Sequence, residues 1–313
     1  MTTLRAAMTQ TVSAYPEMPE RIEDLPSLAD RLDDIREANL DHHADLIAQA
    51  AAMGANAIGL GELFAMPYFA LGRDPMWLAC AEDSLDGPSV GRMRTEAARH
   101  GMVIVAPIYE LCARSGERFN TAVVIDRDGD VLGKFRKAHI PQGANEQGAF
   151  DEAFYYGPAV DPYNEPSPKI LGDNPLTPVF VTSVGRIGVS ICYDRHFPRM
   201  AEQLAMAGAQ LIFSPAVTFG EKSRRVWDIE FECDAARHNV FIGGSNRMGA
   251  EPPWGQAYFG ATHFVGPCGR YENRSDIAGL IVADLDLGSL EKPDPSGWDL
   301  ARDRNPRIDS DPA

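Results

Sequence analysis

Residues 185–198 read GRIGVSICYDRHFP and contain the most informative pattern of the chain. An apolar, β-prone run ends at Cys192, a short polar segment follows, and Phe197 and Pro198 begin a helix. A thiol at the tip of a strand is held rigidly, and the backbone N–H groups after it can face a developing oxyanion. The alternative is an inert cysteine buried at the end of a core strand. This stretch therefore predicts a strand–turn–helix unit and leaves both roles of Cys192 open.

The overall composition is that of an ordinary globular protein. The chain has 313 residues, 44% of them hydrophobic, and a formal net charge of −16. This length suits one large α/β domain or two small ones. No apolar run approaches the ~20 residues of a membrane span, and the N-terminus lacks a signal-peptide pattern, so we expect a cytoplasmic protein without membrane contact. The acidic charge argues against nucleic acid as a partner, because phosphate binding needs a basic face.

The cysteines indicate a reducing environment. Their number is odd, and they form neither a C-x-x-C pair nor a Cys/His metal spacing; they are Cys80, Cys112, Cys192, Cys233 and Cys268. Reduced thiols are therefore expected, without a disulfide framework or a zinc site.

Alternating apolar runs and helical periodicities organise the chain. Strands are expected at residues 6–12, 57–63, 102–109, 121–125, 131–135, 179–183, 186–191, 211–217, 240–245, 262–265 and 279–286. Helices are expected behind a Ser27 cap up to Gly54, and at residues 88–100, 198–207 and 221–238. His42 falls on the apolar stripe of the first helix and is interpreted as a packed residue. The pattern predicts a layered α/β fold with mixed sheets.

Two segments stand outside this regular pattern. Residues 157–178 contain six prolines, and so long an irregular segment is usually functional or disordered. Residues 291–313 form a polar, proline-rich tail that we expect to extend over a surface or a partner subunit. Residues 1–290 are expected to form a single domain.

Two further windows place a polar residue at the end of an apolar run, as at Cys192. Glu62 lies among small and apolar residues in IGLGELF, residues 58–64. A carboxylate there is partly desolvated and suited to proton transfer near neutrality, although this window taken alone favours a glutamate that caps a loop. Lys137 lies in GKFRKAHIP, residues 133–141, just before Pro141 ends the strand. Its basic neighbours Lys134 and Arg136 fit solvated surface charges.

Together the windows around Glu62, Lys137 and Cys192 resemble, in order, the three motifs of the nitrilase superfamily of carbon–nitrogen hydrolases. The resemblance extends from the first strand to about Asp286. Within the superfamily, it is nearest to β-ureidopropionase and related N-carbamoyl-amino-acid amidohydrolases, through residues 136–141, 150–156, 192–198 and 214–249.

The resemblance implies a four-layer α-β-β-α sandwich and a homodimer or larger assembly. Subunits would pair through the helices at 198–207 and 221–238. Met200, Leu204, Trp227 and Phe231 would then be core or interface residues. No metal or organic cofactor is implied.

The resemblance also implies acyl transfer to a thiol. Cys192 would be the nucleophile and Glu62 the base, and Lys137 with the backbone N–H of Tyr193 would stabilise the oxyanion. The second glutamate of the family, which supports the lysine and the water, would be Glu152. Glu146 competes for this role at a different spacing from the lysine.

Arg195 is the candidate for holding a substrate carboxylate, because a guanidinium fork binds a carboxylate in a two-pronged fashion. The alternative is an arginine that pairs with Asp194 or with another acid of the protein. His196 would contact substrate or pack at the start of the helix. A papain-like pair of Cys192 and His196 is a further mechanism, but it leaves the glutamate and the lysine without roles.

Two residues are expected near these groups. Thr218, after the strand at 211–217, would line the pocket. His139 would lie behind the catalytic groups and not act on substrate itself.

The sequence thus predicts a hydrolase that cleaves a non-peptide C–N bond of a small N-carbamoyl amino acid, with N-carbamoyl-β-alanine the first compound to test. An amidase or nitrilase acting on a neutral compound is the alternative. A catalytically silent binding protein and a peptidase are disfavoured. Extra residues between Pro141 and Phe150, and the proline-rich segment 157–178, depart from the family pattern and leave the substrate open.

Overall fold

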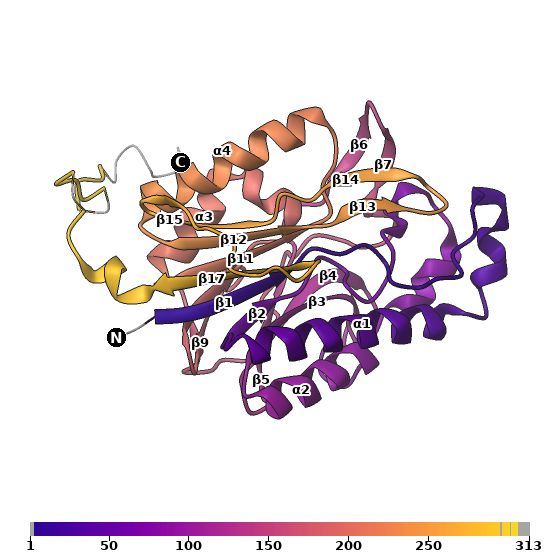
Figure 1. Ribbon diagram of the computed structural model, residues 1–313, viewed down its shortest axis with the longest axis horizontal. Coiled ribbons are helices and arrows are strands. Elements are labelled where there is room, and N and C mark those ends of the chain that lie inside the picture. Colours follow the sequence, from indigo (N-terminus) through magenta and orange to yellow (C-terminus); the bar gives the residue numbers. More distant parts are fainter. Residues whose placement is uncertain (1–2, 295, 301, 306–313) are drawn as a thin grey trace.

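Two β-sheets form the centre of the molecule (Figure 1). The computed structural model describes residues 3–294, 296–300 and 302–305. The first sheet has the order β17-β1-β2-β3-β4-β5, with β1 (Thr3–Thr9), β2 (Ala57–Gly59), β3 (Val103–Leu111), β4 (Arg118–Ile125), β5 (Val131–Arg136) and β17 (Leu280–Asp286). The second has the order β16-β15-β12-β11-β10-β9-β8, with β8 (Ile170–Leu171), β9 (Val179–Thr182), β10 (Gly185–Val189), β11 (Leu211–Ala216), β12 (Phe241–Asn246), β15 (His263–Gly266) and β16 (Gly269–Arg270).

Helices cover the outer face of each sheet. α1 (Leu32–Ala52) and α2 (Pro88–His100) pack on the first sheet, and α3 (Pro198–Met206) and α4 (Glu221–His238) pack on the second. The α-β-β-α sandwich expected from the sequence is thus confirmed. It follows from burying one apolar face of each helix and both faces of each sheet.

The main core lies between the sheets and continues under α3 and α4. Met200, Leu204, Trp227 and Phe231 belong to this core within one chain, so they are core residues. The sheets approach closely at Gly59, where a Cβ atom would lie 2.5 Å from the ring of Phe213. This contact fixes the end of β2 against β11, and the loop that carries Glu62 begins there.

The parallel strands direct their carboxyl ends to one side. β1, β2 and β3 are parallel in the first sheet, and β10, β11 and β12 are parallel in the second. Two hairpins flank this side: β6 (Gln142–Asn145) with β7 (Gly148–Asp151), and β13 (Met248–Glu251) with β14 (Gln256–Phe259). Loops after several strands can therefore meet in one place, as is usual for functional sites in α/β folds.

Several predicted boundaries are corrected. The first strand is Thr3–Thr9 instead of 6–12, and β2 ends at Gly59 instead of residue 63. Ser27 does not cap α1, since it lies in a 3₁₀ helix, Ile22–Leu28, and donates to the carbonyl of Asp24. The buried histidine of α1 is His43, while its neighbour His42 is only half-buried.

The predicted hairpins and the later helices are confirmed. β4 pairs with β5 and β9 pairs with β10, both antiparallel. The proline-rich segment 157–178 is irregular apart from β8. Its Asn164 side chain accepts from the N–H of Lys134 and donates to the carbonyl of Lys134. The segment thereby covers the outer edge of β5, which would otherwise present unpaired backbone groups.

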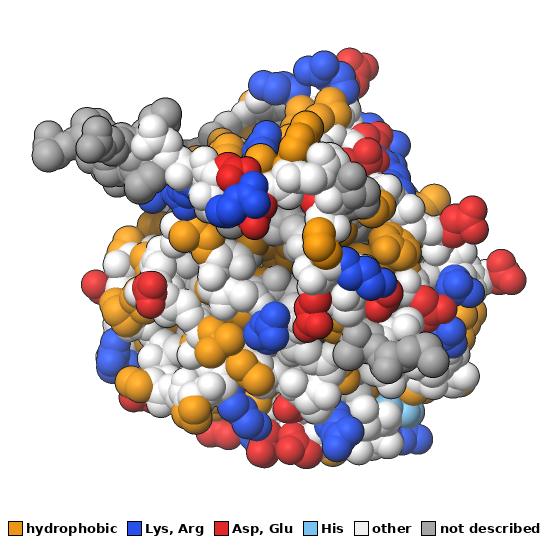
Figure 2. All heavy atoms as spheres, turned by 90° about the vertical axis from the view of Figure 1, so that its left-hand side faces the viewer, with side chains coloured by type: hydrophobic (Ala, Val, Ile, Leu, Met, Phe, Trp, Pro, Cys, Tyr) orange, Lys and Arg blue, Asp and Glu red, His pale blue; other side chains and the backbone are white. Residues whose placement is uncertain are grey.

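The described part of the tail returns to its own chain, where Arg304 lies 3.3 Å from Glu202 of α3. The predicted partner contact concerns a tail of which residues 295, 301 and 306–313 lie outside the described residues. On the face shown in Figure 2, acidic and basic side chains are interspersed and not grouped by sign. Among the described residues, no helix has the length and apolar character needed to cross a membrane.

Candidate active site

Four residues far apart in the sequence meet at the carboxyl side of the strands. Glu62 follows β2, Lys137 follows β5, Glu152 follows β7, and Cys192 follows β10. All four are buried, with exposed fractions of 0%, 0%, 1% and 5% respectively. The structure therefore brings together all four residues for which the sequence suggested a catalytic role.

Lys137 lies between two carboxylates. Its Nζ is 2.9 Å from Oε1 of Glu62 and 2.6 Å from Oε2 of Glu152. Burial alone would lower the pKa of Lys137, but the charges of Glu152 and Glu62 hold that pKa above its ordinary value. The ammonium group thus stays charged in a site that excludes water, where a fixed cation interacts strongly with a developing anion.

The carboxylate of Glu62 accepts from three directions. Besides Lys137, Asn120 donates to Oε1 at 2.7 Å, and the backbone N–H of Val217 donates to Oε2 at 2.5 Å. The Val217 carbonyl in turn accepts from the thiol of Cys192, with the sulfur 3.6 Å away. The backbone of Val217 therefore links the carboxylate of Glu62 to the thiol of Cys192 through two hydrogen bonds.

Glu152 is held from its second side by Tyr68, whose hydroxyl donates to Oε1 at 2.8 Å. Burial and the charge of Glu62 raise the pKa of Glu152, against the opposing effect of Lys137. Glu146, the competing residue, is exposed at the tip of the β6–β7 hairpin. There it accepts from the first backbone N–H of α4 and has no place in the buried cluster.

Cys192 occupies a strained backbone position. Its φ is +52°, in the left-handed region, and it begins a 3₁₀ helix, Cys192–His196, that leads into α3. Residues in this region cluster at functional sites, where the surrounding structure holds them. Burial, followed by the charge of Glu62, raises the pKa of Cys192 to about 12, although Lys137 and Arg195 act to lower it. The resting thiol is therefore neutral, and its attack requires a base.

Asp194 ties the cysteine turn to the segment after Lys137. Its Oδ1 accepts from the N–H groups of Ala138 and His139 at 3.2 and 2.9 Å, and lies 2.7 Å from Nδ1 of His139. Its Oδ2 accepts from the N–H of Ile191. His139 accordingly lies behind the cluster, where its ring stacks on Phe197.

Arg195 is already engaged by neighbouring groups. Its Nη1 donates to the carbonyl of Cys192 at 2.7 Å, its Nη2 donates to Oγ1 of Thr218 at 3.3 Å, and its Nε lies 3.3 Å from Glu230. The acid that faces it is Glu230, not Asp194. The carboxylate role predicted for Arg195 requires exchange of this internal partner.

His196 and Tyr193 lie at the rim of the turn. Nδ1 of His196 is 2.6 Å from Glu230, which gives this ring a carboxylate partner while the thiol of Cys192 bonds to backbone. This arrangement favours the carboxylate–lysine pairing over a papain-like pair. The side chain of Tyr193 is 37% exposed and rests against the imidazole.

The sequence reasoning missed the polar residues that hold this cluster. Asn120 and Tyr68 contact the two glutamates, and Asp194 fixes the cysteine turn. A polar residue inside the apolar strand β4 could have indicated Asn120, and adjacency to Cys192 could have indicated Asp194. Nothing in the sequence marks Tyr68 among its aromatic neighbours.

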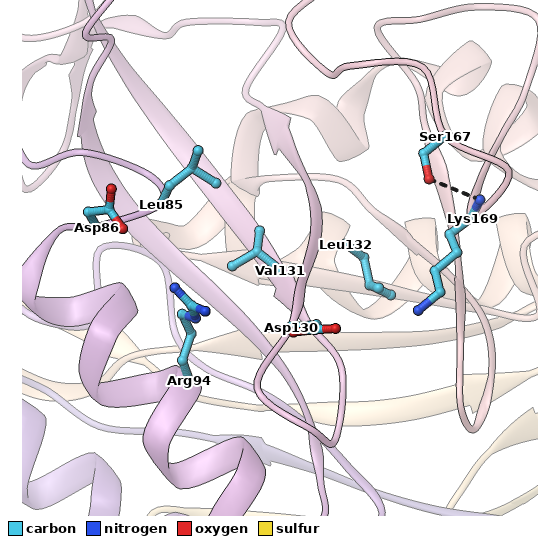
Figure 3. A pocket seen from close by; sticks show the side chains of 8 residues that line it. All are labelled: Leu85, Asp86, Arg94, Asp130, Val131, Leu132, Ser167 and Lys169. Carbon is cyan, nitrogen blue, oxygen red and sulfur yellow. Dashed lines mark hydrogen bonds between the residues drawn. The ribbon is translucent and has the colours of Figure 1, made fainter.

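A surface cavity of about 450 Å³ lies elsewhere, between α2, β5 and the proline-rich segment (Figure 3). Arg94 and Lys169 border it from opposite sides, with Val131 and Leu132 between them. None of its lining residues belongs to the four-residue cluster. Within the described ranges, no group of three or more His, Cys, Asp or Glu side chains is arranged to hold a metal ion.

Comparison with known proteins gives consistent matches. Residues 34–292 match the model of the carbon-nitrogen hydrolase family. β-Ureidopropionase of Arabidopsis thaliana is 33% identical over 84% of this chain, and the match spans 64% of that relative's length. N-carbamoylputrescine amidase of the same plant is 31% identical, over 84% of this chain and 86% of the relative.

A solved structure supports the same assignment. The carbon-nitrogen hydrolase from Helicobacter pylori superposes with a TM-score of 0.77 at 25% identity, covering 98% of this chain and 96% of that one. This superposition agrees with the α-β-β-α sandwich. The chain therefore belongs to the carbon-nitrogen hydrolase family, whose members act on non-peptide C–N bonds.

Proposed function

We propose that this protein hydrolyses a C–N bond of a small N-carbamoyl compound through a covalent intermediate on Cys192. The observation that carries the proposal is the position of Lys137, which is buried between Glu62 and Glu152 and adjoins a neutral thiol. A buried lysine paired with two carboxylates adds little to the stability of the fold, because desolvation costs offset much of the pairing energy. The relatives named for ureido substrates support the same class of compound.

The proposed reaction begins with the attack of the Cys192 sulfur on the ureido carbonyl carbon. Glu62 takes the thiol proton as the C–S bond forms, and Lys137 with the N–H of Tyr193 stabilises the oxyanion. In other hydrolases, one positioned donor of this kind lowers the barrier by about 3–4 kcal/mol. Glu62 then passes the proton to the leaving nitrogen as the C–N bond breaks. It later activates the water that hydrolyses the thiocarbamate, which restores the thiol and releases carbamate, the source of ammonia. Glu152 keeps Lys137 oriented throughout.

We propose that the far end of the substrate is an amino acid carboxylate. Arg195 would exchange its contact with Glu230 for this carboxylate. Thr218 and His196 would adjoin that group. A simple neutral amide, or less readily a nitrile, is the second candidate, because the Arg195 fork already has internal partners.

We also propose that the protein assembles as a homodimer or larger oligomer through the outer faces of α3 and α4. Met206 at the end of α3 and Ile229 on α4 are exposed apolar residues on these helices. α3 and α4 lie against each other, and contiguous exposed apolar patches mark surfaces that pair.

The test is a screen of the purified protein for ammonia release. N-carbamoyl-β-alanine, N-carbamoylputrescine, propionamide and propionitrile are compared at equal concentration. We expect the ureido compounds to exceed the amide and the nitrile by at least tenfold in kcat/KM. Cys192→Ala should lower kcat by about 10⁴-fold or more while leaving the fold intact.

Two outcomes would overturn the proposal. One is a Cys192→Ala variant that retains activity within tenfold of the parent. The other is a preference for the amide or the nitrile, which would move the substrate to the second candidate. For Arg195, the carboxylate role is wrong if Arg195→Ala impairs N-carbamoyl-β-alanine and propionamide equally.

A further inference from the structure

We infer that Asn246 and Arg247, adjacent residues at the end of β12, are positioning residues that orient Glu62 and Cys192. The inference rests on the proposed roles of those two residues. Both side chains are buried, and each binds the backbone of a loop that contributes to the site.

Arg247 holds the loop after β2. Its Nη2 donates to the carbonyls of Glu62, Leu63 and Met66 at 3.2, 3.2 and 2.8 Å. Leu63 has a φ of +50°, a conformation that a leucine adopts only under external support. The guanidinium supplies that support directly beside the carboxylate-bearing residue.

Glu251 completes this half of the arrangement. It pairs with Nη1 of Arg247, and its other oxygen accepts from the N–H of Tyr68 at 2.9 Å. Tyr68 is the residue whose hydroxyl binds Glu152. One buried ion pair therefore fixes both ends of the loop that runs from Glu62 to Tyr68.

Asn246 holds the loop after β11. Its Oδ1 accepts from the N–H of Thr218 at 2.9 Å, and its Nδ2 donates to the carbonyl of Thr218 at 3.0 Å. The preceding residue, Val217, is the one whose N–H binds Glu62 and whose carbonyl binds the thiol of Cys192. Because Asn246 binds both the N–H and the carbonyl of Thr218, the peptide group after Val217 has little freedom to rotate.

The two loops are joined by a hydrogen bond at the Glu62 carboxylate, which belongs to the first loop and accepts from the second. They also pack through the rings of Tyr68 and Phe219. Because Asn246 ends β12 and Arg247 follows it directly, their spacing fixes the offset between the loops. A small shift in that offset moves the carboxylate away from the thiol without removing any reacting group. Misplacement of about 1 Å can lower a rate by about 10²-fold.

Two variants test the inference, each with a matched control. Arg247→Lys keeps the charge beside Glu251 but loses Nη2, which binds the three carbonyls. Its control is Arg5→Lys, since Arg5 also binds an acid, Asp284, and a backbone carbonyl, that of Met53, but it lies at the amino end of β1.

Asn246→Ala loses both contacts to Thr218. Its control is Asn273→Ala, because Asn273 also grips one residue, Ser275, by its N–H and its carbonyl, outside the site. Each variant is assayed with N-carbamoyl-β-alanine and with the amide that the parent cleaves fastest. Its thermal unfolding is followed in parallel.

We expect Arg247→Lys and Asn246→Ala to lower kcat by about 10- to 100-fold with KM within twofold of the parent. Both should also slow the single-turnover acylation of Cys192 by the same factor. The two controls should keep kcat within twofold at a comparable loss of thermal stability. A purely structural role would lower stability in all four variants and leave kcat per folded molecule unchanged.

The inference is overturned if kcat in the site variants equals that of their controls while Cys192→Ala is inactive. If Cys192→Ala itself remains active, the proposed function fails instead, so the two failures are distinguished. A variant that does not fold at 25 °C is replaced by Asn246→Asp or by Arg247→Gln, to which the same criteria apply.

Discussion

Asp194 shows, at the scale of a single residue, how much of the site depends on side chains that never meet substrate. Its carboxylate joins the turn at Cys192 to the segment just after Lys137 through three backbone N–H groups and the ring Nδ1 of His139. The relative placement of nucleophile and cation therefore depends on one buried acid.

Asp194→Asn tests this dependence. The amide places an N–H group against the N–H of Ile191, so one buried donor loses its acceptor. We expect a loss of about 1–3 kcal/mol in the free energy of unfolding, measured in urea. We also expect kcat to fall by about tenfold or more. Unchanged stability and unchanged kcat would together show that the turn is held by other contacts.

His43 carries a prediction about pH. Burial lowers the pKa of His43 from 6.5 to about 3. Below pH 6.5 the unfolded chain takes up a proton that the folded chain refuses, so stability is complete above that pH and is lost as the pH falls toward 3. The contribution amounts to about 1.4 kcal/mol per pH unit in this window.

His43→Gln should therefore flatten the dependence of the free energy of unfolding on pH between 4 and 6. The comparison is with His42→Gln, whose imidazole is only half-buried, so the slope should change less. Urea midpoints at four pH values are sufficient. Identical slopes in the parent and in both variants would contradict the assignment of this pH dependence to His43.

At the scale of elements, the β6–β7 hairpin separates two glutamates that the sequence left in competition. Glu152 lies at the base of the hairpin against Lys137, and Glu146 lies at its tip against the first turn of α4. The extra residues noted between Pro141 and Phe150 belong to this hairpin. Its strands alternate poorly and are rich in glycine and polar residues, so periodicity could not reveal it.

Glu152→Gln and Glu146→Gln form a matched pair for this element. The first removes a charge that holds Lys137 and should lower kcat by about 10²-fold or more. The second keeps an oxygen that can accept from α4 and should leave kcat within twofold. Steady-state kinetics on the same substrate decides between them, and equal losses would return Glu146 to consideration.

Regular elements with strong periodicity were predictable, and boundaries set by local chemistry were not. α4 follows the predicted range at both ends, because Gly220 precedes it and Asn239 ends it in the left-handed region. α1 begins later than predicted, because Ser27 bonds backward within a 3₁₀ turn instead of capping forward. The clustering of Glu62, Lys137 and Cys192 was likewise predictable. Each residue lies at the end of an apolar run, in a segment that resembles a family motif.

The residues that hold those three could not be found in this way. Arg247 binds the carbonyl of Glu62 from 185 positions away, and Asn120 binds its carboxylate from 58 positions away. A polar residue within an apolar strand, such as Asn120, can be noticed in the sequence. Its partner cannot, because a single sequence does not pair residues across such distances.

At the scale of the whole molecule, the assembly proposed through α3 and α4 makes a direct prediction. Ile229 on α4 is 54% exposed, and Leu85, before α2 on the opposite outer layer, is 55% exposed. Ile229→Arg should weaken or abolish the dimer, because a charge would enter an apolar contact. Leu85→Arg should leave it unchanged. Sedimentation velocity over a range of concentrations measures both, and a parent that sediments as a monomer would refute the proposed assembly.

The left-handed backbone at Cys192 has a consequence for the evolution of this fold. Side chains branched at Cβ are strongly disfavoured at a φ of +52°, whereas unbranched ones can be accommodated. A lineage that carries this turn can exchange its thiol for the hydroxyl of serine, but threonine would distort the loop that presents it. The geometry of a single peptide unit thus restricts which nucleophiles selection could install in this position.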